Sequence, residues 1–123
     1  MIPMIPPTNY VIEEPITQVE YRVIQQINDY RIENGLPKAK PDYKTCRVAR
    51  ERVGEIQVDF SHDGFHRRKT WPIIWHENLG RYADESNIVG AWKSSPSHNK
   101  NLLQSIKNLC IKTENGYWVM ESK

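Results

Sequence analysis

Three side chains in the middle of the sequence could do chemistry together: His62, Glu77 and His98. Imidazoles bind divalent metals and exchange protons near neutral pH, and a nearby carboxylate can orient the bound water. The spacing of the three residues matches none of the short zinc motifs such as HExxH or CxxC. They could therefore meet only in the folded chain, either as a metal site with open water positions or as a hydrogen-bonded network without metal.

His98 belongs to a segment that should begin a helix. Ser95 is a good N-cap residue, and Pro96 suits the first helical position. His98 would then be the third residue of that helix, where the positive end of the helix dipole disfavours an imidazolium. We expect a neutral His98 that is free to bind a metal or accept a hydrogen bond.

Two long helices should precede these residues. Thr17 and Glu20 have the spacing of a capping box that starts the first helix, and Asn34-Gly35 is a typical helix end. The second helix should begin near Asp42 and end at residues 59–61, just before His62. Its buried face steps by three and four residues through Cys46, Ala49, Val53, Ile56 and Phe60.

The rest of the chain predicts three strands and two short helices. Residues 73–82 could form a strand that carries Glu77, and Asp84 could cap a third helix in which Gly90 marks close packing. Asn115-Gly116 between two short β-type runs is a strong hairpin signal. The predicted fold class is α+β, with a small antiparallel sheet flanked by about four helices.

The N-terminal residues 1–15 differ from the rest of the chain. They hold four of the eight prolines together with several large apolar side chains. Proline keeps such a segment out of helices and central strands, so we predict an extended arm ahead of a single domain at residues 16–123. The arm's apolar side chains suggest self-association or binding to a protein partner.

Composition restricts the possible partners and surroundings. A chain of 123 residues with a net charge of +2 is one globular domain, and that charge does not favour nucleic-acid binding. No apolar run is long enough to span a membrane, and no signal peptide is evident in this chain. The location stays open: cytoplasmic, virion-associated, or secreted with a signal removed.

The two cysteines, Cys46 and Cys110, lie at positions with apolar neighbours. Two cysteines do not make a disulfide framework. We predict two buried, reduced thiols, with one long-range disulfide as the alternative.

The joint pattern of motifs resembles the CAP superfamily (cysteine-rich secretory, antigen 5 and pathogenesis-related-1 proteins), and most closely its short bacterial SCP-like branch. The likeness covers most of the chain, from about residue 21 to residue 120. It rests on five segments in order: Ile27 to Arg31 with Asn34 to Pro37, Cys46 to Ala49, Ser61 to Gly64, Glu77 to Leu79, and Trp92 to Leu103.

The resemblance implies an α-β-α sandwich with a central cleft. His62 and His98 would bind a divalent metal such as Zn²⁺ in that cleft, beside Glu77. The chain departs from the family pattern at two positions. Ser95 stands near the place of a second acid, and His76 replaces a glycine and adds either a ligand or a surface ring.

Two functions follow from this pattern. The first is a non-enzymatic binding or structural module whose cleft is formed by His62, Glu77, Ser95 and His98, as part of a larger assembly such as a phage virion. The alternative is a metal-dependent hydrolase of peptide or cell-wall bonds with Glu77 as the base. The missing second acid and the lack of an obvious nucleophile favour the first. A lipid carrier finds no support, because no dedicated apolar loop is evident.

Overall fold

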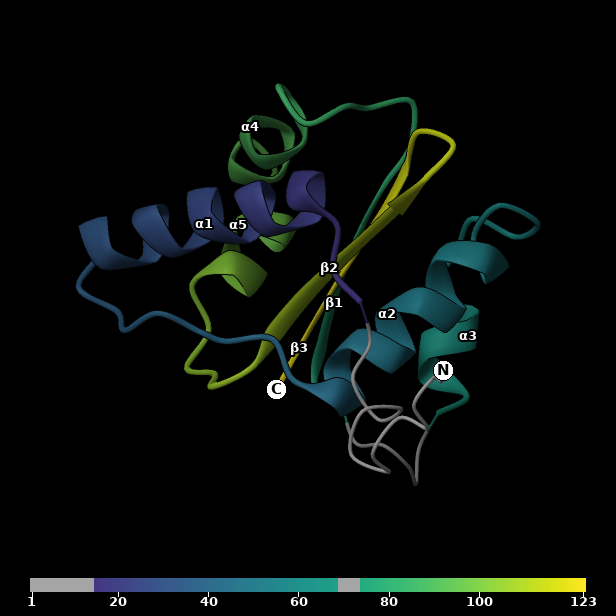
Figure 1. Cartoon of the computed structure of the whole chain (residues 1–123), viewed down its shortest axis with the longest axis horizontal. Helices are drawn as coiled ribbons and strands as arrows, with labels where there is room; N and C mark the ends of the chain where they lie inside the picture. Colours follow the sequence, from purple (N-terminus) through teal and green to yellow (C-terminus); the bar gives the residue numbers. More distant parts are fainter. Residues whose placement is uncertain (1–14, 69–73) are drawn as a thin grey trace, which may run out of the picture.

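The computed structural model describes residues 15–68 and 74–123, so the predicted arm lies outside the described residues except for Pro15 (Figure 1). The elements, in order, are α1 (Gln18–Glu33), α2 (Tyr43–Glu55), α3 (Asp63–His66), β1 (His76–Gly80), α4 (Ile88–Lys93), α5 (Pro96–Leu102), β2 (Leu109–Glu114) and β3 (Tyr117–Ser122). This order confirms the α+β prediction. The single-turn helix α3 is an addition.

The three strands form one antiparallel sheet in the order β1-β3-β2. Asn115 and Gly116 both have positive φ angles, 55° and 80°, which confirms the predicted hairpin turn between β2 and β3. Helices α1, α4 and α5 cover one face of the sheet, and α2 with α3 covers the other (Figure 1). The structure is therefore the expected α-β-α sandwich.

The alternation of β3 residues builds a separate core on each face of the sheet. Trp118 and Met120 are buried against α1 and α4, whereas Val119 is buried against α2. Strand β1 is an edge strand, so residues from both helical layers can approach it. This position makes β1 the place where a site shared by the two layers can form.

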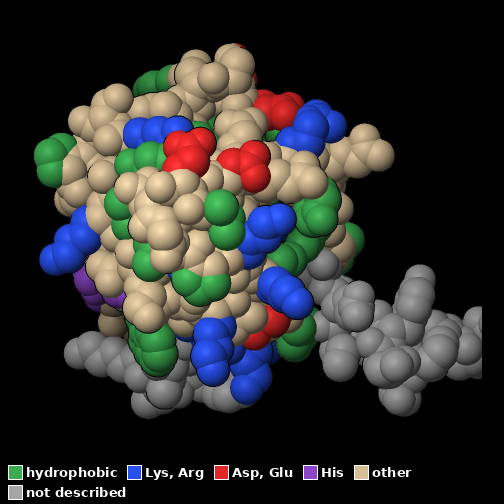
Figure 2. All heavy atoms as spheres, turned by 90° about the vertical axis from the view of Figure 1, so that its left-hand side faces the viewer, with side chains coloured by type: hydrophobic (Ala, Val, Ile, Leu, Met, Phe, Trp, Pro, Cys, Tyr) green, Lys and Arg blue, Asp and Glu red, His purple; other side chains and the backbone are tan. Residues whose placement is uncertain are grey.

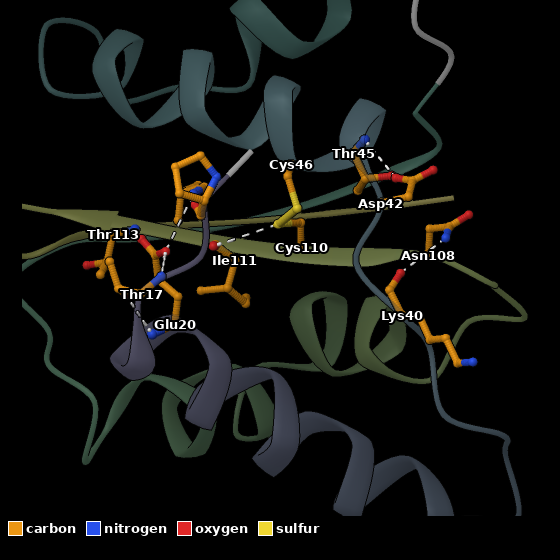
Figure 3. The surroundings of a disulfide bond; sticks show 12 residues. Thr17, Glu20, Lys40, Asp42, Thr45, Cys46, Asn108, Cys110, Ile111 and Thr113 are labelled. Atoms are coloured by element: carbon orange, nitrogen blue, oxygen red, sulfur yellow. Dashed lines mark hydrogen bonds and ion pairs between the residues drawn. A yellow bond between two sulfur atoms is a disulfide. The ribbon is translucent and has the colours of Figure 1, made fainter. Parts of the chain in front are cut away.

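The start of α1 follows the sequence prediction. Thr17 Oγ1 accepts a hydrogen bond from the Glu20 backbone N–H at 3.1 Å, and Glu20 Oε1 accepts one from the Thr17 N–H at 3.0 Å. The other Glu20 oxygen accepts from the Thr113 N–H at 3.1 Å and so ties α1 to β2 (Figure 3). Gly35, with φ 77°, follows the C-cap residue Asn34 in the predicted left-handed conformation.

The prediction of reduced thiols is wrong, because Cys46 and Cys110 form a disulfide (Figure 3). Both residues are buried, as expected. The apolar face of α2 packs directly on β2 and brings the two Cα atoms to 5.0 Å, within the usual disulfide range. That approach depends on how α2 rests on the sheet, which helical spacing alone does not reveal.

Three local predictions also differ from the structure. Helix α2 ends at Glu55 and continues as turns. Asp84 does not cap α4; its side chain accepts from Ser86 in the preceding turn. Gly90 is exposed, and a Cβ there would meet nothing within 4 Å, so this glycine does not mark close packing.

Among the described residues, no helix is both long and apolar enough to cross a bilayer. Figure 2 shows the face at which α1 ends, where Lys and Arg side chains lie among apolar and neutral side chains and several acidic ones.

Candidate functional site

Glu77 is the centre of a buried ionic cluster between β1 and α2. Its side chain is only 1% exposed, and the guanidinium of Arg52 in α2 donates hydrogen bonds to both carboxylate oxygens. Arg52 Nε donates to Oε2 at 2.7 Å, and Nη2 donates to Oε1 at 3.0 Å. This two-point contact is the strongest arrangement available to an arginine and a carboxylate. It fixes Glu77 as a buried anion.

His62 contacts the same carboxylate from the segment between α2 and α3. Its Nδ1 lies 2.8 Å from Glu77 Oε1, while the side chain as a whole is 45% exposed. A carboxylate accepts hydrogen bonds, so Nδ1 carries the proton and the neutral ring has its lone pair on Nε2. The contact therefore orients the ring and leaves Nε2 for a ligand.

Arg52 also holds the backbone that leads into His62. Its Nη2 donates to the Ser61 carbonyl at 2.6 Å, and Nη1 donates to Glu55 Oε1 at 2.8 Å. Gly64 packs against this group, because a Cβ at Gly64 would lie 2.3 Å from Arg52 Nη1 and from Glu55 Oε1. One buried arginine thus positions both Glu77 and His62.

A second arginine closes the outer side of the cluster. Arg68 donates to Glu55 Oε2 at 2.6 Å and to Glu51 Oε1 at 3.1 Å. The hydrogen bond from Arg68, opposed by partial burial and assisted by Arg52, lowers the pKa of Glu55 to about 2. Glu55 therefore stays ionised near neutral pH and forms ion pairs with both arginines.

Glu121 adds a second carboxyl group behind Glu77. It is the cross-strand partner of Glu77 in β3 and is fully buried. Burial, and then the neighbouring Glu77, raises the pKa of Glu121 well above its usual range. Burial acts against the charge of Glu77 as well, but the neighbouring Glu121 and the hydrogen bonds from Arg52 outweigh burial and lower the pKa of Glu77. Glu121 is thus a neutral acid beside the Glu77 anion, and neither of its buried oxygens has a hydrogen-bond partner among the described residues.

A pH dependence follows from Glu121. Its folded pKa is raised, so the folded protein holds a proton that the unfolded chain releases above about pH 4.5. Stability therefore falls as the pH rises towards the folded pKa of Glu121. The variant Glu121→Gln keeps the size of this buried side chain but cannot ionise. We expect its free energy of unfolding to rise relative to that of the natural protein between pH 5 and pH 8, as urea titrations would measure. The slope is at most about 1.4 kcal/mol per pH unit for one proton. A constant difference over this range would contradict the assignment.

Ser95 and His98 form the second pair predicted from the sequence. Ser95 precedes α5 and His98 is its third residue, as expected. The Ser95 hydroxyl lies 2.8 Å from His98 Nδ1 rather than on a backbone N–H, so the expected side-chain cap is replaced by a contact with the ring. Burial, and then electrostatic repulsion from His62 when that ring is protonated, lowers the pKa of His98. This agrees with the expected neutral imidazole.

Two asparagines connect β1 to α5 and thereby link the pairs. Asn78 Nδ2 donates to the His98 carbonyl at 3.0 Å. Asn101 Nδ2 donates to Asn78 Oδ1 at 2.9 Å and to the Glu77 carbonyl at 3.2 Å. The structure thus joins His62 directly to Glu77, and His98 to Ser95, with the asparagines between them. The role of these four residues in binding a ligand stays a prediction.

His76 does not extend the Glu77 cluster. Side chains alternate along β1, so His76 projects to the face opposite Glu77, the same face as Asn78. Burial, and then the charge of Lys100, lowers the pKa of His76. The substitution of His76 for a glycine therefore adds no group beside His62 and Glu77.

A hollow of the described surface lies away from these residues. A depression of about 660 Å³ separates α1 from the segment 38–41, and Tyr21, Asn28 and Lys38 are among its lining residues. None of the four predicted site residues lines it. The candidate site is thus a set of polar groups around the edge of β1 rather than this hollow.

Comparisons with known proteins agree with this architecture. The model of the cysteine-rich secretory protein family (CAP) matches residues 24–106, more than half of the chain. No curated protein sequence is significantly similar.

Three solved bacterial structures share the fold. An extracellular protein with an SCP domain from Bacillus anthracis has a TM-score of 0.72 and 20% identity over 89% of this chain and 44% of its own. An outer surface protein of Borrelia burgdorferi has a TM-score of 0.72 and 18% identity over 90% of this chain and 96% of its own. A cysteine-rich secretory protein of Staphylococcus aureus has a TM-score of 0.68 and 18% identity over 88% of this chain and 40% of its own. The chain therefore spans less than half of the Bacillus and Staphylococcus proteins.

Proposed function

The chain belongs to the CAP family, and on that premise we propose that it is a non-enzymatic binding module. Its binding element consists of the imidazoles of His62 and His98 at the edge of β1. Glu77 and Arg52 serve this element by holding His62 in one tautomer and orientation. Ser95 does the same for His98 from the first turn of α5.

One observation carries the proposal: both oxygens of the Glu77 carboxylate are buried and already engaged by neighbouring side chains. Both oxygens accept hydrogen bonds from Arg52, one also contacts His62, and the side chain is 1% exposed. A general base must reach the proton that it removes. These contacts support Glu77 as a residue that positions His62, and they count against the hydrolase alternative, which needs Glu77 as the base.

The same contacts limit the number of protein ligands that a metal ion could use at this site. Among the described residues there is no group of three or more His, Cys, Asp and Glu side chains that could hold a metal ion. His62 and His98 could each offer Nε2, because Nδ1 of each ring is already in a hydrogen bond. The residues do not fit a closed tetrahedral zinc site, which needs four protein ligands. We propose that a divalent metal binds here only when solvent or a bound partner supplies the remaining ligands.

An extracellular setting is part of the proposal. A disulfide persists in oxidising compartments and is rare in reducing ones, and this chain closes one between α2 and β2. The similar structures from Bacillus and Borrelia are described as an extracellular and an outer surface protein. In such a setting residues 1–15, with their prolines and apolar side chains, would fasten the domain to a protein partner or larger assembly.

Zinc titration of the purified protein, followed by calorimetry, tests the proposal. We expect His62→Gln and His98→Gln each to weaken zinc binding at least tenfold, because each removes one of two protein ligands. Glu33→Gln removes an exposed carboxylate at the end of α1, outside the site, and is the control that should bind as the natural protein does.

Activity assays complete the test. The zinc-loaded protein should release no product from casein or from purified cell wall. Zinc-dependent hydrolysis that His98→Gln abolishes would establish the hydrolase instead. Equal zinc affinity in all four proteins would remove the imidazole pair from the proposal.

A further inference from the structure

A partly exposed cluster follows the C-terminal end of β1. The guanidinium carbon of Arg81 lies 4.3 Å from the centre of the Phe60 ring and 5.4 Å from that of Tyr82. Tyr117 contacts both rings, with centroid distances of 6.1 Å to Phe60 and 6.4 Å to Tyr82. We call Phe60, Arg81 and Tyr82 the Arg81 clamp.

From this cluster we infer that the Arg81 clamp binds a carboxylate group in an acidic segment of a partner protein. The surface is distinct from the imidazole pair of the proposed function. Arg81 lies beyond the end of β1, four residues after Glu77.

The Arg81 guanidinium is held in place by the aromatic rings but has no carboxylate partner among the described residues. Within residues 15–68 and 74–123 no carboxylate forms an ion pair with it, whereas Arg22, Arg52 and Arg68 all have carboxylate partners. A guanidinium that stacks on ring faces leaves its N–H groups pointing outward in its own plane. Those N–H groups match the two oxygens of a carboxylate, so the stacked Arg81 needs little ordering to bind one.

Tyr82, a member of this cluster, has a strained backbone conformation. Its φ is 58°, in the left-handed region, although it is a bulky residue, and the residue is 83% exposed. The next residue is fixed to the hairpin: Ala83 N–H donates to the Gly116 carbonyl at 3.3 Å, and Trp118 Nε1 donates to the Ala83 carbonyl at 2.9 Å. The strain is not offset by burying the ring. Strained backbone of this kind occurs preferentially at functional sites.

The surroundings favour a protein over a sugar as the source of the carboxylate. Arg81 already covers one face of the Phe60 ring and one face of the Tyr82 ring, which a stacking sugar would need. Val58, 92% exposed, adds open apolar surface near Phe60 in the sequence. Aromatic residues and arginine are enriched in protein interfaces and dominate their binding energy.

NMR titration of the ¹⁵N-labelled full chain tests the inference. The probe is a blocked tetraglutamate peptide, and galacturonate and inorganic phosphate are added separately at up to about 20 mM. We expect the peptide to shift the Arg81 side-chain Nε–H and the amides of Phe60 and Tyr82 saturably. Galacturonate and phosphate should bind at least about tenfold more weakly.

Matched variants assign the binding to the clamp. Arg81→Gln should weaken peptide binding roughly tenfold, and Arg81→Lys should weaken it too, because lysine keeps the charge but lacks the planar fork. Tyr82→Gly keeps the positive φ without strain and should also weaken binding. Arg22→Gln removes the same charge from an exposed ion pair and should bind normally.

The opposite results overturn the inference. These are unchanged peptide affinity in Arg81→Gln, tighter binding of galacturonate or phosphate than of the peptide, or no saturable shift with any probe. None of them bears on zinc binding by His62 and His98, so the proposed function is tested independently.

Discussion

Replacing Arg52 with methionine will lower the free energy of unfolding by about 3–5 kcal/mol, the range for breaking a buried ion pair from one side. The side chains of Arg52 and Glu77 are each 1% exposed and share a two-point contact. Without Arg52, the Glu77 anion stays buried and must either take up a proton or draw water into the core. Urea unfolding followed by circular dichroism would measure the loss.

Two further variants separate this effect from a general loss of charge. Arg47→Met removes a more exposed ion pair with Glu51, at 3.3 Å, and should cost less than about 1 kcal/mol. The double variant Arg52→Met with Glu77→Leu should recover much of the lost stability, because no unpaired charge is left inside. If Arg52→Met were no more harmful than Arg47→Met, Arg52 would not be the residue that holds the site together.

His62 should respond to the same change. Arg52 holds the Ser61 carbonyl and the Glu77 carboxylate, and both lie next to His62. We therefore expect a weaker zinc affinity in Arg52→Met even under conditions in which it is fully folded. A merely structural role for Arg52 would leave the zinc affinity of the folded fraction unchanged.

Signals confined to a few neighbouring residues were sufficient to predict parts of the fold. The capping box of Thr17 and Glu20 and the hairpin turn at Asn115-Gly116 depend on local backbone geometry, which residue type and spacing determine. Gly90 shows the limit of this reasoning. A glycine inside a helix suggests that a neighbouring element packs closely there. Whether one does depends on residues that are distant in the sequence, and at Gly90 none does.

The candidate site was predictable only in part. The resemblance pointed to His62 and Glu77, whose side chains do meet, but Arg52 was missed. Arg52 lies three residues after Ala49 and four before Ile56, on the buried face of α2, and a charged residue in such a position requires a buried partner. The sequence offered that signal. It did not identify Glu77 as the partner, because the two residues are 25 positions apart.

The register of the hairpin gave a second clue. Counting back from the Asn115-Gly116 turn pairs Cys110 with Glu121, which is the observed register. A carboxyl group opposite a buried cysteine must itself be buried, and so a neutral Glu121 could have been anticipated. Its contact with Glu77 could not, because that contact depends on β1 joining the other side of β3.

Removing the disulfide should have an effect as large as removing Arg52, by a different physical route. The bond joins residues 64 positions apart, and closing a loop of that length restricts the unfolded chain by about 4 kcal/mol on the chain-entropy model. We expect Cys46→Ala with Cys110→Ala to lower the free energy of unfolding by about that amount, with some further loss from the missing sulfur atoms in the core. Cys46→Val with Cys110→Ala restores part of the volume and should recover only that packing loss.

Reductant should lower the melting temperature of the natural protein towards that of the variants and leave theirs unchanged. A natural protein whose mass does not rise by about 2 Da on reduction, and whose melting temperature is insensitive to reductant, would show that Cys46 and Cys110 are free thiols after all.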